Sequence, residues 1–246
     1  MVLQGGLIRP ADEAFATGEL LMGNDIVGST VATAPGWADY PLNWGLVIAA
    51  AIALALNIPN IYYLTPHLLK VLTRWRWNLT IEASIQLSRT RDYISLFCMA
   101  PFVLIADRYS FFQLELFERI PPDWHVLGVV GLLLAFYIVR SIIFLALEGS
   151  APKHSIFMTA RKAERTFFII IVFLSIIELG VMVLSGVADD TIRSVLLGTA
   201  MFIYFAFIIK KAQILGSACS PFSTILYLCA LEFVPAGLLV ATCVLL

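Results

Sequence analysis

Charged side chains are scarce in this 246-residue chain, since Asp, Glu, Lys and Arg together make up 13% of it. Soluble domains carry about twice that share. Hydrophobic residues make up 60% of the chain, and the mean hydropathy is +0.90. This composition excludes an ordinary soluble domain and predicts an integral membrane protein whose first partner is the lipid bilayer. The net charge of −1 provides no bulk positive field for nucleic acid, so we expect no such partner.

The sequence also lacks the motifs of the common catalytic and cofactor chemistries. It contains no His-Glu-x-x-His, no Gly-x-Ser-x-Gly, no phosphate-binding glycine loop and no Cys-x-x-Cys pair. The three histidines, His67, His125 and His154, fall at the edges of the predicted spans, so they are poorly placed to ligate a haem between helices. We therefore expect no cofactor, no metal and no enzymatic activity.

Long apolar runs are what the chain has in abundance. A helix of about 20 apolar residues crosses the hydrocarbon core of a bilayer. Six such runs predict an all-α integral membrane protein with six transmembrane helices. The predicted spans are residues 44–64, 93–110, 124–148, 166–187, 192–209 and 222–246. Residues 1–43, which are polar and acidic, form a separate N-terminal tail, and residues 44–246 form the transmembrane domain.

The first predicted span contains three residues that interrupt a helix, Asn57, Pro59 and Asn60. Proline removes a helical hydrogen bond, and asparagine side chains can satisfy the backbone groups that are freed. Two interpretations stay open: a kink that serves packing, or a broken helix that lines a cavity.

A basic stretch interleaved with tryptophan and leucine follows the first span. This pattern predicts an amphipathic helix in the headgroup layer rather than an RNA-binding segment. The interfacial basic residues are Lys70, Arg74, Arg76, Arg89 and Arg91. A second amphipathic interfacial helix is expected just before Trp124.

Loop charge predicts the orientation of the chain. The segments after the first, third and fifth spans are basic, whereas the loops on the other side carry most of the acidic residues. The positive-inside rule places the basic segments in the cytoplasm, so both termini are expected on the opposite side.

Three ionisable residues fall within the predicted spans: Arg140, Glu178 and Glu232. A charge at mid-depth costs about 2.5–3.5 kcal/mol on insertion scales, so each should face a partner. Counting about 1.5 Å per residue from the cytoplasmic ends puts both glutamates about 16 Å deep and Arg140 about 12 Å deep. All three are therefore expected to meet at one level, with Tyr137 and Cys229 facing the same way. The set is interpreted either as a polar clasp between three helices or as a proton or cation site.

The run from Ile225 to Pro235, ILYLCALEFVP, resembles the C-terminal helix of a family of multi-pass inner-membrane proteins of the Bacteroidetes, a domain of unknown function. The resemblance carries Tyr227, Cys229, Glu232 and Pro235 across as residues that line the site. It implies the bacterial inner (cytoplasmic) membrane, and hence periplasmic termini, but it implies no activity. The helix around Glu178 lacks the family's proline, so that residue is not carried over.

Two functions follow as hypotheses, beside a third, a membrane enzyme, for which no catalytic or metal motif is found. The first is a non-catalytic membrane subunit or scaffold of a cell-envelope complex, with protein export or surface motility as the class of assembly. Its N-terminal tail and loops would contact the other envelope proteins. The alternative is a small proton- or ion-coupled transporter that uses Glu232, Glu178 and Arg140. A dry, packed cluster favours the first hypothesis, and a water-filled route favours the second.

Overall fold

The structure is a computed structural model that describes residues 37, 40–73, 76–112, 120–121, 124–148, 154–217, 220–235 and 237. Helix makes up 91% of the chain that it describes, and no strand occurs there. Three described helices are long and apolar enough to cross a membrane, or four if one bent pair counts as a span. The predicted all-α membrane protein is confirmed to this extent.

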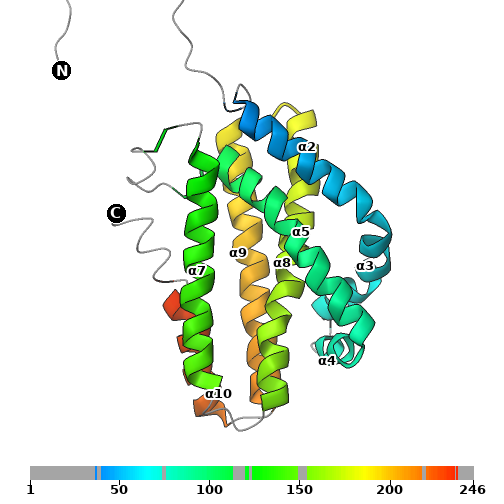
Figure 1. Cartoon of the computed structure of the whole chain (residues 1–246). Coiled ribbons are helices and arrows are strands. Elements are labelled where there is room, and N and C mark those ends of the chain that lie inside the picture. The colour runs from blue at the N-terminus through cyan, green and yellow to red at the C-terminus, as the bar shows by residue number, and fades with distance from the viewer. Residues whose placement is uncertain are drawn as a thin grey trace, which may run out of the picture.

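The three candidate spans lie in α7 (His125–Glu148), α8 (His154–Leu184) and α9 (Asp189–Gly216). These helices run roughly side by side along the long axis of the molecule (Figure 1). A short turn joins α8 to α9, and Gly186 within it has φ +66°, a left-handed conformation that glycine adopts without strain. Asp189 and Asp190 occupy the first turn of α9, where carboxylates complement the helix dipole.

Both α8 and α9 are longer than their predicted spans. Helix α8 begins at His154 rather than near residue 166, and α9 continues to Gly216 rather than ending near residue 209. Hydropathy falls where charged residues begin, but Lys, Arg and Glu are good helix formers, so both helices continue beyond their apolar stretches.

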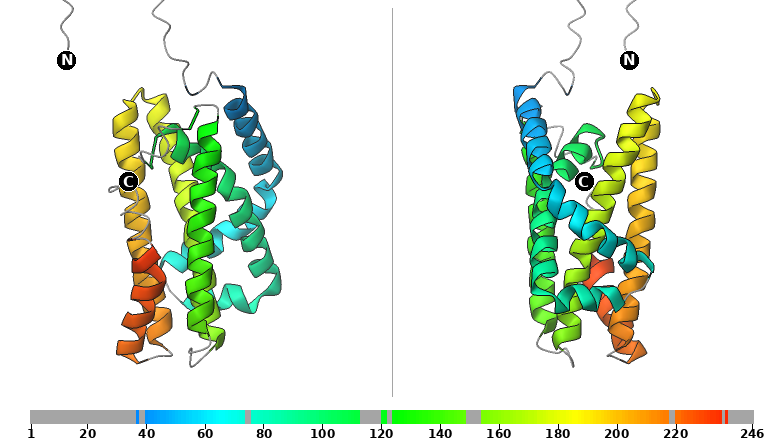
Figure 2. Two further views of the ribbon diagram at one scale, coloured as in Figure 1. Left: turned by 60° about the vertical axis from the view of Figure 1, so that its left-hand side comes forward. Right: turned by 90° about the vertical axis from the view of Figure 1, so that its right-hand side faces the viewer.

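The predicted break in the first span is present at Asn57. Helices α2 (Pro41–Leu56) and α3 (Ile58–Thr73) meet there at a bend of 70°. The Asn57 amide donates to the carbonyl of Ala53 at 2.8 Å, and Asn60 donates to Asn57 Oδ1 at 3.3 Å. Beyond the bend, α3 runs across the long helices instead of along them (Figure 2). The first span is therefore not one straight helix over residues 44–64.

A short helix, α4 (Arg76–Ala83), leads into α5 (Ile85–Arg108), which crosses the bundle diagonally (Figure 1). Ser84 caps α5 by accepting a hydrogen bond from the backbone N–H of Leu87 at 3.4 Å. The second predicted span lies in α5 but is not among the candidate spans. The reason is that charged residues at both ends, Asp92 and Asp107, leave only 14 residues between them.

The sixth predicted span is described only in part. Helix α10 (Pro221–Leu228) passes directly into a π-helical turn, η4 (Cys229–Phe233). Together they form an apolar helix shorter than a full span, and residues 238–246 lie outside the described chain. Six spans therefore stay a prediction.

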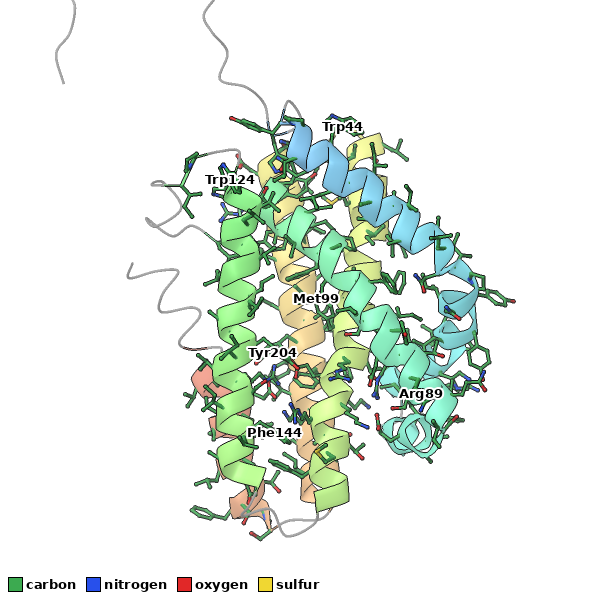
Figure 3. The ribbon with its side chains drawn as sticks, in the orientation of Figure 1. Trp44, Arg89, Met99, Trp124, Phe144 and Tyr204 are labelled. Carbon is green, nitrogen blue, oxygen red and sulfur yellow. The ribbon has the colours of Figure 1, made fainter. Side chains whose placement is uncertain are left out.

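Apolar side chains from α3, α5, α8, α9 and α10 form the main core. Its fully buried members include Leu64, Ile94, Ile169 and Ile214. In contrast, α7 exposes large apolar residues such as Ile142 and Leu145, a surface suited to lipid. Figure 3 shows Trp44 and Trp124 at one end of the molecule, where exposed aromatic residues suit a membrane–water interface.

A polar contact at that same end ties Trp37 to α5. The Trp37 indole N–H donates to Asp107 Oδ2 at 2.5 Å, while His125 Nδ1 lies 2.5 Å from Asp107 Oδ1. Asp107 is buried, so these two partners satisfy a carboxylate that has almost no access to solvent. Most of the predicted tail, residues 1–36 and 38–39, lies outside the described residues.

Candidate functional site

The candidate site is a set of four charged residues contributed by four different helices, here called the buried ionic cluster. Its members are Arg140 of α7, Glu164 of α8, Lys211 of α9 and Glu232 of η4. Glu232 and Lys211 are 1% and 2% exposed, so both charges depend on protein partners rather than on solvent.

Glu232 is the centre of the buried ionic cluster. Arg140 Nη2 donates to its Oε1 at 2.6 Å, and the Lys211 ammonium donates to the same oxygen. The hydroxyl of Tyr204 donates to the other oxygen, Oε2, at 3.3 Å. Arg140 Nη1 donates in turn to Glu164, so one guanidinium joins both carboxylates.

The π-helical turn is the local feature that places Glu232. A π-turn adds one residue to a helical turn, which rotates the residues after it by about 100°. Leu231 and Glu232 are consecutive in η4, yet both are buried. Leu231 packs into the apolar core while Glu232 reaches the two cations.

The buried ionic cluster is electrically balanced and almost filled. Two cations face two carboxylates, and the cavity beside them holds about 30 Å³, room for about one water molecule. Tyr137, Ser141 and Phe144 line this cavity together with members of the cluster, and the Arg161 guanidinium lies 4.3 Å from the centre of the Phe144 ring. A compensated ionic set without a large cavity is suited to holding four helices together.

The cluster lies toward one end of α8 and α9. Glu164 is seven residues from Phe157, where the candidate span of α8 starts, which corresponds to about 10 Å. Lys211 is five residues from the end of α9, or about 8 Å. Figure 3 places Phe144 and Tyr204, which flank the cluster, away from the end that carries Trp44 and Trp124.

Glu178 does not join Arg140 and Glu232, contrary to the expectation that all three meet at one level. It lies 14 residues beyond Glu164 on the same helix, or about 21 Å along its axis. Its Oε1 accepts a hydrogen bond from Thr199 Oγ1 at 2.8 Å. Its Oε2 is buried and has no hydrogen-bond partner among the described residues.

The residues expected to line the site have separate surroundings. Tyr137 lines the small cavity beside Arg140. Tyr227 is buried against Phe157, with ring centres 5.5 Å apart. Cys229 is exposed instead of facing the cluster, because the π-turn changes the helical phase between it and Glu232. Pro235 is buried.

A second ionic network corrects the role predicted for Arg91. This residue is 1% exposed, so it does not face headgroups. Its guanidinium contacts Glu82 and lies 2.7 Å from Asp92, and these two carboxylates compensate its burial. The network continues to α8, where Lys162 contacts Glu82 and Arg165 contacts Asp92, each at 2.7 Å.

The pKa of Asp92 shows the balance of forces in this network. Burial of the carboxyl would raise its pKa, but hydrogen bonds and charge attraction from Arg91 and Arg165 outweigh that effect. The net result is a pKa below the ordinary value of 3.8. Asp92 is therefore held in its ionised form.

The other predicted interfacial bases have different settings. Lys70 lies 4.8 Å from the centre of the Trp77 ring, a cation–π contact at the polar edge of α3. Arg89 is exposed. Arg76 begins α4, and Arg74 lies outside the described residues.

Sequence reasoning missed Glu164, Lys211 and Tyr204, because it assigned the first two to the ends of predicted spans or to loops. A signal was present, since Tyr204 and Lys211 are seven residues apart, two helical turns on one face. Following the helical period through the charged ends of the spans would have placed both residues on the same side of α9.

Comparison of the chain with known protein families, curated proteins and solved structures finds no match. Among the residues that the structure describes, no group of three or more His, Cys, Asp or Glu side chains could hold a metal ion.

Proposed function

We propose that the protein is a non-catalytic membrane subunit or scaffold of a cell-envelope complex, in which the buried ionic cluster is a structural clasp. The observation that carries the proposal is the double contact on Glu232, where Arg140 and Lys211 share one carboxylate oxygen. A group that must take up and release a proton or cation needs access to water, whereas Glu232 and Lys211 are 1% and 2% exposed and the cavity beside them has about 30 Å³.

The location and topology of the protein are also part of the proposal. The chain crosses the bacterial inner membrane six times with both termini in the periplasm, and protein export or surface motility is the class of assembly. The resemblance of the segment around Glu232 to Bacteroidetes inner-membrane proteins supports the location.

Gentle purification of the full chain from its source membrane, followed by quantitative mass spectrometry, tests this proposal. We expect a stoichiometric set of envelope proteins to accompany the chain. A variant that lacks residues 1–36 should keep the transmembrane helices but lose part of that set, because the tail and loops are the proposed contact surfaces. Recovery of the intact chain alone, or as a homo-oligomer, contradicts the subunit proposal.

One observation favours a second candidate, a small proton- or ion-coupled transporter. Glu178 lies within an apolar span, and one of its carboxyl oxygens is buried without a hydrogen-bond partner among the described residues. Ionisable groups at membrane depth often belong to proton or ion pathways. Thr199 is its single described hydrogen-bond donor, which leaves room for a transported cation or proton to interact with the free oxygen.

Reconstitution into proteoliposomes tests the transporter. If Glu178 is the coupling group, a pH gradient should drive flux in the wild-type protein and Glu178→Gln should abolish it. Thr199→Val removes the donor but keeps the carboxylate, so it should weaken flux without abolishing it. Equal proton leakage in protein-containing and empty vesicles rejects this candidate and leaves the subunit proposal standing.

A further inference from the structure

A groove of about 750 Å³ lies where the bend between α2 and α3 faces the start of α5. This volume falls within the range of about 300–1,000 Å³ that small-molecule sites occupy. One wall is formed by Leu56 and Asn60 at the bend, and the other by Arg89, Tyr93 and Phe97 of α5. The groove is separate from the buried ionic cluster.

The wall on α5 changes from polar to apolar along its length. Gln86, Arg89, Tyr93 and Phe97 follow one another at three- or four-residue intervals, so they form one stripe along the helix. The distance from Arg89 to Phe97 along the axis is about 12 Å. The stripe therefore has a hydrogen-bonding and cationic end and an aromatic end, as an amphipathic ligand requires.

Among the described residues that line the groove, Arg89 is the only charged one. Its side chain is exposed, and no hydrogen bond or ion pair joins it to another described residue. Arg91, two residues away, is buried instead, and Glu82 and Asp92 neutralise its charge. Within the described part of the chain, the groove thus offers an anion a guanidinium that has no ionic partner.

The level of Arg89 suits the surface of a bilayer. The ion pairs of Glu82 with Lys162 and of Asp92 with Arg165 lie beside this part of α5, where the apolar length of α8 gives way to charged residues. Figure 3 shows Arg89 low on α5, far from the end that carries Trp44 and Trp124.

We propose that this groove binds an anionic phospholipid from the leaflet on the side of Arg89. The phosphate accepts hydrogen bonds from the guanidinium of Arg89, whose planar fork matches phosphate oxygens. Asn60 and Gln86 lie beside the headgroup, and the acyl chain runs along Tyr93 and Phe97. The site does not depend on whether the protein is a subunit or a transporter.

Native mass spectrometry of the purified full chain in detergent, with phosphatidylglycerol or phosphatidylcholine added, tests the proposal. We expect the anionic lipid to bind about fivefold more tightly, the effect of one basic residue on an anionic lipid surface. Arg89→Gln should remove this preference, and Arg89→Lys should keep part of it. The matched control is Arg108→Gln, which removes an exposed charge from the same helix outside the groove and should leave the preference unchanged.

Two further measurements separate a lipid site from a simple anion site. Gln86→Trp fills the groove without changing its charge, so it should weaken the binding of both lipids. Inorganic phosphate at the same concentration should not displace the lipid, because it has no acyl chain to occupy the apolar end. Equal affinity of the wild-type protein for the two lipids, an unchanged preference in Arg89→Gln, or displacement by phosphate would each overturn the proposal.

Discussion

Arg140 and Glu232 are 92 positions apart in the chain, yet a hydrogen bond of 2.6 Å joins them across the interface between α7 and η4. The same glutamate oxygen contacts Lys211 of α9. One carboxylate therefore links three helices, and Arg140 extends the link to Glu164 of α8.

Replacing Glu232 should destabilise the protein strongly. Glu232→Gln keeps the shape of the side chain but removes its charge. Arg140 and Lys211 then stay buried, with only the Glu164 carboxylate left in the cluster to compensate them. Removing one partner of a buried ion pair costs about 3–5 kcal/mol, and we expect the lower end because glutamine still accepts a hydrogen bond. Thermal unfolding of the detergent-solubilised protein measures the loss.

Glu164→Gln is the matched control for that variant. Glu164 is 35% exposed and contacts the cluster through Arg140, so Glu164→Gln leaves the contacts of Glu232 with Arg140 and Lys211 in place. We expect a smaller loss of stability than for Glu232→Gln. Equal stability of the two variants would show that Glu232 does not hold the helices together.

The two neighbouring lysines near the end of α9 should differ in how much their replacement lowers the free energy of unfolding. Lys211 is 2% exposed and donates to Glu232, whereas Lys210 is only partly buried. Lys211→Met should lower the free energy of unfolding by about 1.5–3 kcal/mol, since it removes a hydrogen bond between charged groups. Lys210→Met should cost less than Lys211→Met, because Lys210 is only partly buried. Equal losses measured in the same unfolding assay would contradict the assigned role of Lys211.

The Asp92 network predicts a loss of stability in acid. The pKa of Asp92 is lower in the folded protein than its ordinary value of 3.8. The stabilisation is therefore fully present above that value and is lost as the pH falls through the lower, folded-state pKa. Asp92→Asn should remove this part of the acid-induced fall in unfolding temperature.

Asp189→Asn is a suitable comparison for Asp92→Asn. Asp189 is 66% exposed and lies 3.4 Å from Arg108, a surface pair that contributes little. This variant should keep the acid dependence of the wild-type protein. If Asp92→Asn and the wild-type protein lose stability in parallel below pH 3.8, the proposed coupling is wrong.

The predicted topology can be tested by cysteine labelling in intact spheroplasts. In a background without the four native cysteines, Thr30→Cys should react with a membrane-impermeant thiol reagent, because the tail is predicted to be periplasmic. Ser217→Cys, at the end of α9, should react only after lysis. The reverse pattern would overturn the orientation inferred from loop charge.

Several features of the fold follow directly from local sequence. Runs of Leu, Ile, Phe and Ala in α7, α8 and α9 predict apolar helices because their backbone groups must be satisfied within the membrane. The break at Asn57 is also local, since asparagine and Pro59 act on the backbone within one turn. Arg140 and Glu232 stand out as candidate residues because a charge within an apolar run is costly.

Other features are not registered by hydropathy. Helix α8 starts at His154 and α9 ends at Gly216, beyond the apolar runs, because Lys, Arg and Glu residues favour helix. Arg89 and Arg91 lie in the same basic stretch of the sequence, yet Arg91 is buried and Arg89 is exposed. The difference arises because Glu82 and Asp92 compensate Arg91.

The sequence by itself determined that this is an all-α membrane protein, where its first helix pair bends, and which charges need partners. Those properties depend on transfer free energies and backbone geometry, which act over a few residues. The tertiary structure alone decided that Glu232 pairs with Arg140 and Lys211 while Glu178 pairs with Thr199. Partner choice depends on helix phase, including the π-turn at Cys229–Phe233, and on which helices pack together, and neither is a local property.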